Sequence, residues 1–206
     1  MEPGISPTKG NLIKAKNTLS LSKQGYELLD KKRNILTMEM MSFIDKAQIV
    51  QSRIDSTFKD AYYALQSANI TLGISNVEQL GYTFPEDDSV SIRFRSIMGV
   101  EIPMVDFVKP KLEPKYGFSR TSSALDEAYE KFNEVKALTA ELAEVENAVY
   151  RLAVNVMKTK KRANALKNIV IPKYREIVKH IQEYIEEKER EDFSRLKVIK
   201  NRKNNK

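Results

Sequence analysis

The feature that most constrains this chain is an apolar seven-residue repeat in the first third of its sequence. Every seventh residue from Leu12 to Ala68 is apolar except Arg33. A second apolar stripe begins three residues later and includes Leu29 and Phe43. Two such stripes, sustained over about nine heptads, predict one long helix of a coiled coil, on the order of 95 Å in length.

The last third of the chain carries the same repeat. Every seventh residue from Ala128 to Tyr184 is apolar, and the companion stripe first lies three residues later. Beyond Val170 the companion stripe lies four residues later, so the apolar face is expected to rotate along the helix. Pro172 falls inside the pattern and is expected to kink the helix or to open its hydrogen bonding locally.

Together, the stripes of the two ends define a predicted coiled-coil core. Its members are Leu12, Leu19, Tyr26, Leu29, Leu36, Met40, Phe43, Val50, Ile54, Val135, Leu142, Val149, Val156, Val170 and Ile177.

The segment between the two helices breaks the helical period. Apolar and polar residues alternate from Ser89 to Arg95 and again from Val100 to Ile102, which predicts a short β-hairpin with a half-buried first strand. Pro103 is expected to limit the second strand. The prediction is a mainly α fold: a long antiparallel two-helix coiled coil with a short β-hairpin insert at its distal end. The expected segments are an N-terminal helix (1–71), the connecting insert (72–122), and a C-terminal helix with a basic tail (123–206).

The sequence offers no candidate for catalysis. It contains no cysteine, so disulfides and thiolate metal sites are excluded, and His180 is its only histidine. Its glycines fit neither nucleotide-binding fingerprint. We therefore expect no catalytic residue, no cofactor and no metal, and we interpret the acidic run near Glu186–Asp192 as a solvated helix face. No apolar run approaches the roughly 20 residues that span a bilayer, so direct membrane insertion is not expected.

The chain has a formal net charge of +7, which favours acidic partners. Two basic clusters would fall at one height if the helices pair antiparallel. We refer to them as the basic collar: Lys31, Lys32, Arg33, Lys158, Lys160, Lys161 and Arg162. One interpretation of the collar is a solvated helix face, and the other is a contact with an acidic partner surface.

Several segments resemble the D-subunit family of V-type (A/V-type) ATPases. The run Gly25–Leu36 (GYELLDKKRNIL) is similar to the N-terminal signature of that family, and Thr159–Leu166 (TKKRANAL) with the following Ile169–Pro172 is similar to its C-terminal signature. The run Ile97–Pro103 resembles its central hairpin. The three motifs occur in the family's order. Lys167 stands where the family more often has Glu.

The resemblance implies a non-catalytic central rotor shaft of a V-type ATPase or ATP synthase. The paired termini would enter a hexameric head of A and B subunits, where the ATP chemistry takes place. The lower shaft would bind the F subunit of the central stalk, and its bottom would rest on the socket subunit (C/d type) above the ion-translocating membrane ring. The shaft would be cytoplasmic within a membrane-peripheral complex, and no nucleic acid is expected as a partner.

Two other functions remain open from the residues alone. A basic coiled coil that binds nucleic acid would explain the tail from Phe193 to Lys206, which carries six Lys or Arg and no acid. However, the basic residues of this tail are not interleaved with the aromatic residues that stack on nucleotides. A homodimeric scaffold or a membrane-curving helical protein is the second alternative.

Overall fold

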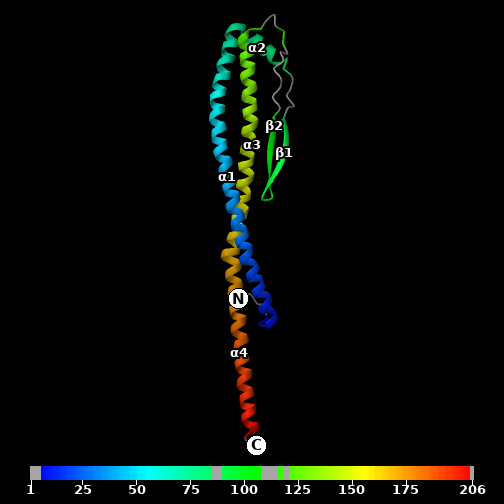
Figure 1. The fold of residues 1–206 in the computed structure, drawn as a ribbon, viewed down its shortest axis with the longest axis vertical. Helices are drawn as coiled ribbons and strands as arrows, with labels where there is room; N and C mark the ends of the chain where they lie inside the picture. The colour runs from blue at the N-terminus through cyan, green and yellow to red at the C-terminus, as the bar shows by residue number, and fades with distance from the viewer. Residues whose placement is uncertain (1–5, 85–89, 108–115, 118–120, 205–206) are drawn as a thin grey trace. The chain divides into compact units, whose positions relative to one another are not determined.

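The computed structural model describes residues 6–84, 90–107, 116–117 and 121–204 of the 206-residue chain. In chain order the elements are helix α1 (Lys9–Leu72), helix α2 (Ile74–Gly81), strands β1 (Val90–Ile97) and β2 (Val100–Phe107), helix α3 (Ser123–Ala165), the π-helical segment η2 (Leu166–Val170) and helix α4 (Ile171–Asn204) (Figure 1). The predicted mainly α fold, with a long helix at each end and a hairpin between them, is confirmed.

By its contacts the chain divides into two compact units. The first unit combines Met1–Asn34 with Met157–Lys206, and the second unit is Ile35–Val156. Both α1 and α3 therefore contribute to both units, and the insert belongs entirely to the second.

In the first unit the start of α1 runs antiparallel to the end of the chain. Lys9 Nζ lies 2.8 Å from Glu189 Oε1, and Gly25 lies against the side chain of Leu166. Residue numbers rise on one helix as they fall on the other, as the sequence predicts. Among the described residues of this unit, the buried side chains are mostly small: Ala15, Thr159, Ala163 and Ile181.

In the second unit three apolar clusters join α1 to α3. Leu36 packs with Ala148 and Leu152, and further along α1, Ile54 packs with Leu138. A third cluster, near the end of α1, includes Ala68, Tyr116 and Leu125 and is covered by residues of α2. The sequence of partners again requires antiparallel helices within one chain. Burial of these layers is the main stabilising contribution, because long isolated helices gain little stability from propensity alone.

The hairpin is made by a two-residue turn. Met98 has φ 51° and Gly99 has φ 76°, so both central residues are in the left-handed region that a type I′ turn requires. Ile97 then pairs with Val100, and the register continues to Val90 opposite Phe107. The insert begins where α1 ends, and its hairpin folds back alongside α3, with Val100 and Ile102 in the Leu36 cluster (Figure 1).

Two expectations about the hairpin are wrong. Pro103 does not limit the second strand, because β2 continues to Phe107 and Pro103 is paired with Phe94 inside it. Hydrogen-bonded and non-hydrogen-bonded residue pairs alternate along an antiparallel ladder, and Phe94 with Pro103 is a non-hydrogen-bonded pair. The N–H that proline lacks would therefore make no bond to β1. Strand β1 is also not half-buried: nearly every one of its side chains is exposed, apolar ones included.

Candidate functional site: partner-binding surfaces

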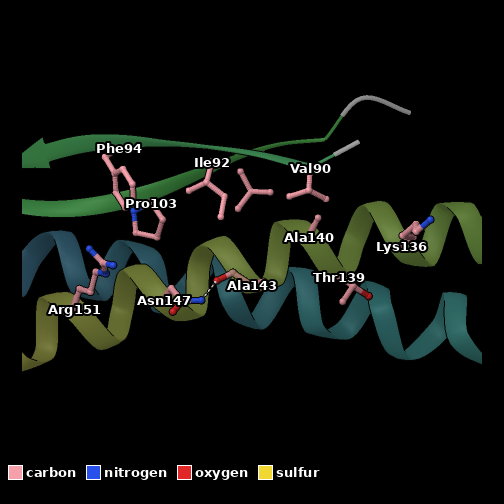
Figure 2. Close-up of a pocket in the computed structure, with 11 residues that line it drawn as sticks. Val90, Ile92, Phe94, Pro103, Lys136, Thr139, Ala140, Ala143, Asn147 and Arg151 are labelled. Carbon is pink, nitrogen blue, oxygen red and sulfur yellow. Dashed lines mark hydrogen bonds between the residues drawn. The ribbon is translucent and has the colours of Figure 1, made fainter. Parts of the chain in front are cut away.

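An apolar groove lies between the hairpin and α3 in the second unit. Val90, Ile92 and Phe94 point from β1 toward the α3 surface that carries Ala140 and Ala143 (Figure 2). The groove has a volume of about 570 Å³. Its three strand residues are 49%, 59% and 60% exposed, respectively. Apolar side chains that face a groove and remain accessible mark an interaction surface. We name this feature the hairpin groove.

Polar contacts hold β2 against α3 and so fix one wall of the hairpin groove. The carboxylate of Glu144 accepts a hydrogen bond of 2.6 Å from the backbone N–H of Val105, which points away from β1. Arg151 Nη1 donates to the carbonyl oxygen of Glu101 at 3.2 Å. The guanidinium of Arg151 also lies 5.5 Å from the ring centre of Phe94. These contacts give partners to two backbone groups on the edge of β2 that faces away from β1, the N–H of Val105 and the carbonyl of Glu101.

An ion pair joins the two strands on the exposed face of the hairpin. Arg93 Nη2 donates to Asp106 Oδ1 at 2.7 Å, and Arg93 Nε bonds the second carboxylate oxygen. The hydrogen bond from Arg93 lowers the pKa of Asp106 from its ordinary value, and the same bond raises the pKa of Arg93. Both groups are exposed, so the pair orients the two strands more than it stabilises the fold.

A second groove, which we name the α2 groove, lies where α1, α2 and α3 meet and has a volume of about 500 Å³. Its wall is aromatic: Phe84 stacks on Tyr129 with ring centres 4.8 Å apart. The side-chain nitrogen of Asn133 is buried in this wall and finds no hydrogen-bond partner among the described residues. Burial and a hydrogen bond to Asp126 raise the pKa of the neighbouring Tyr116 to about 12.

The basic collar lies in the first unit. Lys31 is exposed while Lys32 and Arg33 are half-buried. On α3 every collar residue is exposed: Lys158, Lys160, Lys161 and Arg162. Arg33 Nη2 lies 2.8 Å from Asp30 Oδ1 and 3.1 Å from Asn34 Oδ1, so its charge is partly neutralised within α1.

The register of the helices places the two halves of the collar level with each other. Gly25 lies beside Leu166. Seven residues further along α1 is Lys32, and seven residues back along α3 is Thr159. Thr159 is buried on the inner side of α3, so the basic residues that flank it point outward. The arrangement is a band of positive charge carried by both helices of this unit.

The predicted core positions are buried or half-buried. Leu36, Val50, Ile54 and Val135 are buried, and the others are half-buried. These half-buried positions are Leu12, Leu19, Tyr26, Leu29, Met40, Phe43, Leu142, Val149, Val156, Val170 and Ile177.

Sequence reasoning missed both grooves. The available signal was the apolar set Val90, Ile92 and Phe94, which we assigned to a covered face because alternation is typical of strands with one buried side. The small residues Ala140 and Ala143, which form the floor of the hairpin groove, lie off the heptad stripes and gave no signal of their own.

Comparison with known proteins identifies the family. The model of the ATP synthase D-subunit family matches residues 11–201. The chain belongs to this family. It is 44% identical over 196 residues to the D subunit of the V-type ATP synthase of Thermotoga neapolitana, covering 95% of this chain and 97% of that protein. It is 36% identical over 199 residues to the D subunit of the A-type ATP synthase of Pyrococcus furiosus, with 95% and 93% covered. The corresponding A-type protein of Methanopyrus kandleri is 36% identical over 198 residues, with 95% and 85% covered.

The resemblance seen in the sequence is thereby confirmed, and the D subunit is a component of a rotary ATPase that acts with the rest of that complex. Within the described part of the chain, no helix is long and apolar enough to cross a membrane. The same residues contain no group of three or more acidic, histidine or cysteine side chains placed to hold a metal ion.

Proposed function

We propose that this chain is the non-catalytic central rotor shaft of a V-type ATPase or ATP synthase, and that it transmits torque between the A/B head and the membrane ring. Membership of the D-subunit family, joined to antiparallel pairing of the two chain ends, is the observation that carries the proposal. A shaft needs no active site of its own, and its ATP chemistry belongs to the head.

Torque transmission requires helices that do not slide past each other. Layers such as Leu36 with Leu152 and Ile54 with Leu138 supply this resistance, because close-packed interiors deform little. The three catalytic interfaces of the head would meet different faces of such a shaft. Shaft angle and nucleotide occupancy are then coupled, and the coupling acts in both directions.

The basic collar is the proposed contact with the head. Its α3 residues are exposed and lie in the unit that contains both chain ends, which are the parts that would enter the A/B hexamer. An acidic surface lining that cavity would attract Lys160 and Lys161 without fixing them in one geometry. Long-range attraction of this kind suits a rotating contact better than close ion pairs would.

The hairpin groove is the proposed seat of the F subunit, and the α2 groove is the proposed contact with the socket subunit. The hairpin groove combines exposed apolar side chains with a floor of small residues on α3. A surface of this composition stabilises a bound protein by burial of apolar area. The α2 groove lies at the turn between α1 and α3, the end of the second unit that would rest on the socket. The assembled complex would be peripheral to the membrane on its cytoplasmic side.

Purification of the tagged chain from its native cells tests the proposal. We expect the A, B and F subunits to accompany it, with one copy of this chain per A/B hexamer. A basic scaffold would instead elute as a homodimer without A and B subunits. A nucleic-acid-binding coiled coil would retain DNA or RNA, and salt would release it. Either of the last two results would overturn the proposal.

A further inference from the structure

The α2 groove exists because the chain reverses sharply after α1. Helix α1 ends at Leu72, and Gly73 then adopts φ 81°, a left-handed conformation that glycine takes without strain. The reversal packs Val77 and Leu80 of α2 onto the apolar cluster that contains Leu125 of α3. The walls of the groove therefore come from three helices of one packed unit.

These walls are mainly apolar and aromatic, and they remain partly accessible. Four aromatic side chains line the groove, and each of them is half-buried: Phe58, Phe84, Tyr129 and Phe132. Apolar surface on a concave site is stabilised when a partner covers it. The volume of about 500 Å³ lies within the roughly 300–1,000 Å³ of protein sites that enclose a drug-sized group. The groove can therefore take one large side chain together with its backbone.

One polar group in the wall has no partner. Among the described residues, Asn133 Nδ2 is the one side-chain nitrogen or oxygen that is buried without a hydrogen-bond partner. Other asparagines of α2 and α3 behave differently, because Asn76, Asn147 and Asn155 each donate to the carbonyl oxygen four residues back, at 2.8–2.9 Å. The corresponding acceptor for Asn133 is the carbonyl of Tyr129, and that bond is not made. A buried donor in this state destabilises the free chain.

The missing partner of Asn133 must be an acceptor. The Nδ2 group can only donate hydrogen bonds. Lys136, three residues further along α3, lines the same groove and is positively charged, so a cationic group is disfavoured there. A backbone carbonyl beside a large apolar side chain meets both requirements: the carbonyl accepts from Asn133, and the side chain covers the aromatic walls. A loop of a partner protein presents these two groups together.

We infer that the α2 groove receives one loop of the socket subunit, which inserts a large apolar side chain and whose backbone carbonyl accepts a hydrogen bond from Asn133 Nδ2. The inference rests on the proposed seating of the socket subunit in this groove, and it names the chemistry of recognition. Asn133 then determines specificity, because a loop without a free carbonyl at this point leaves the donor buried and unpaired and binds more weakly.

Two substitutions at Asn133 separate a hydrogen bond from apolar contact. Asn133→Leu keeps the branched shape of the side chain and removes the donor, whereas Asn133→Asp replaces the donor with an acceptor. Calorimetric titration of the purified socket subunit into the full-length chain, with the F subunit bound, measures the affinity. We expect Asn133→Leu to weaken binding by about 10- to 100-fold and Asn133→Asp to weaken it further. Asn147→Leu, at an exposed position of α3 outside the α2 groove, should bind like the parent chain.

The stability of the free chain provides a second readout. In urea denaturation, the midpoint of Asn133→Leu should be higher than that of Asn147→Leu. Both changes raise helix propensity by the same amount, but only the first removes a buried, unpaired donor. An equal or lower midpoint for Asn133→Leu would show that the amide stabilises the free chain, and would overturn the inference.

The binding results separate this inference from the assignment of the groove to the socket subunit. If the parent chain binds the socket subunit and Asn133→Leu binds it equally well or more tightly, apolar contact alone holds the loop. In that case the inference fails and the assignment stands. If the parent chain does not bind the socket subunit, both fail together.

Discussion

Truncation of Leu152 tests whether the packed layers of the second unit stabilise its helices and its hairpin. Leu152 is 0% exposed and lies in one cluster with Leu36 of α1 and Val100 and Ile102 of β2. Leu152→Ala removes apolar volume from a site that three separate elements fill, so collapse around the cavity is restricted. Substitutions of this kind cost about 2–5 kcal/mol, and we expect about 3 kcal/mol here because the neighbouring Ala148, one turn earlier on α3, has little side chain to move into the space.

Urea denaturation of the full-length chain, followed by circular dichroism, measures this loss as a lower midpoint at unchanged slope. Tyr150→Ala is the matched control, since it removes a larger side chain two residues away on the same helix, where Tyr150 is 70% exposed. We expect the control to change stability by less than about 0.5 kcal/mol. A loss below about 1 kcal/mol for Leu152→Ala, or equal losses for the two variants, would refute the packing argument.

Three further results are expected. Glu144→Ala removes the carboxylate that accepts a β2 backbone N–H, and should cost about 1–2 kcal/mol in denaturation while loosening the hairpin in hydrogen exchange. Burial and the hydrogen bond to Asp126 raise the folded-state pKa of Tyr116 from 10 to about 12. The contribution of Tyr116 to folding stability is therefore complete below pH 10 and is lost as pH rises toward about 12. Tyr116→Phe should flatten stability across that range. Lys160→Glu with Lys161→Glu should reduce ATP-driven ion pumping more than ATP hydrolysis, measured on reconstituted vesicles.

Each of these results has a matched comparison. Glu141→Ala, at an exposed position on the same helix, should leave the hairpin protected. If the free energy of unfolding of Tyr116→Phe falls with pH as steeply as that of the parent chain, Tyr116 is not the source of the pH dependence. Lys59→Glu reverses an exposed charge in the second unit, away from the basic collar. If it impairs coupling as much as the collar reversal does, the collar has no special role.

Prediction from the sequence succeeded where one physical pattern dominates. The heptad stripes identified α1 and α3 because burial of a single face requires the same spacing over many turns. The alternation of apolar and polar residues correctly predicted the hairpin. It did not predict that the apolar face of β1 stays exposed, because alternation does not reveal whether Val90, Ile92 and Phe94 have a packing partner within the chain. Pro103 was judged by strand propensity alone, whereas its actual position depends on pairing register.

The π-helical turn lay beyond sequence reasoning for a related reason. The shift of the apolar stripe after Val170 indicated a change of helix phase, and Pro172 indicated weakened hydrogen bonding. Neither pattern specifies whether the helix bends or accommodates an inserted residue; the structure has the inserted residue, in the π-helical segment Leu166–Val170.

Direct observation of rotation tests the central claim. The complete complex would be fixed to a surface through its A subunits, with a bead attached to this chain through a single introduced cysteine at the exposed Glu78 of α2. We predict that ATP drives continuous rotation of the bead in one direction, with three preferred angles per turn. A bead that stays fixed relative to the A subunits while the same complexes hydrolyse ATP would contradict the account.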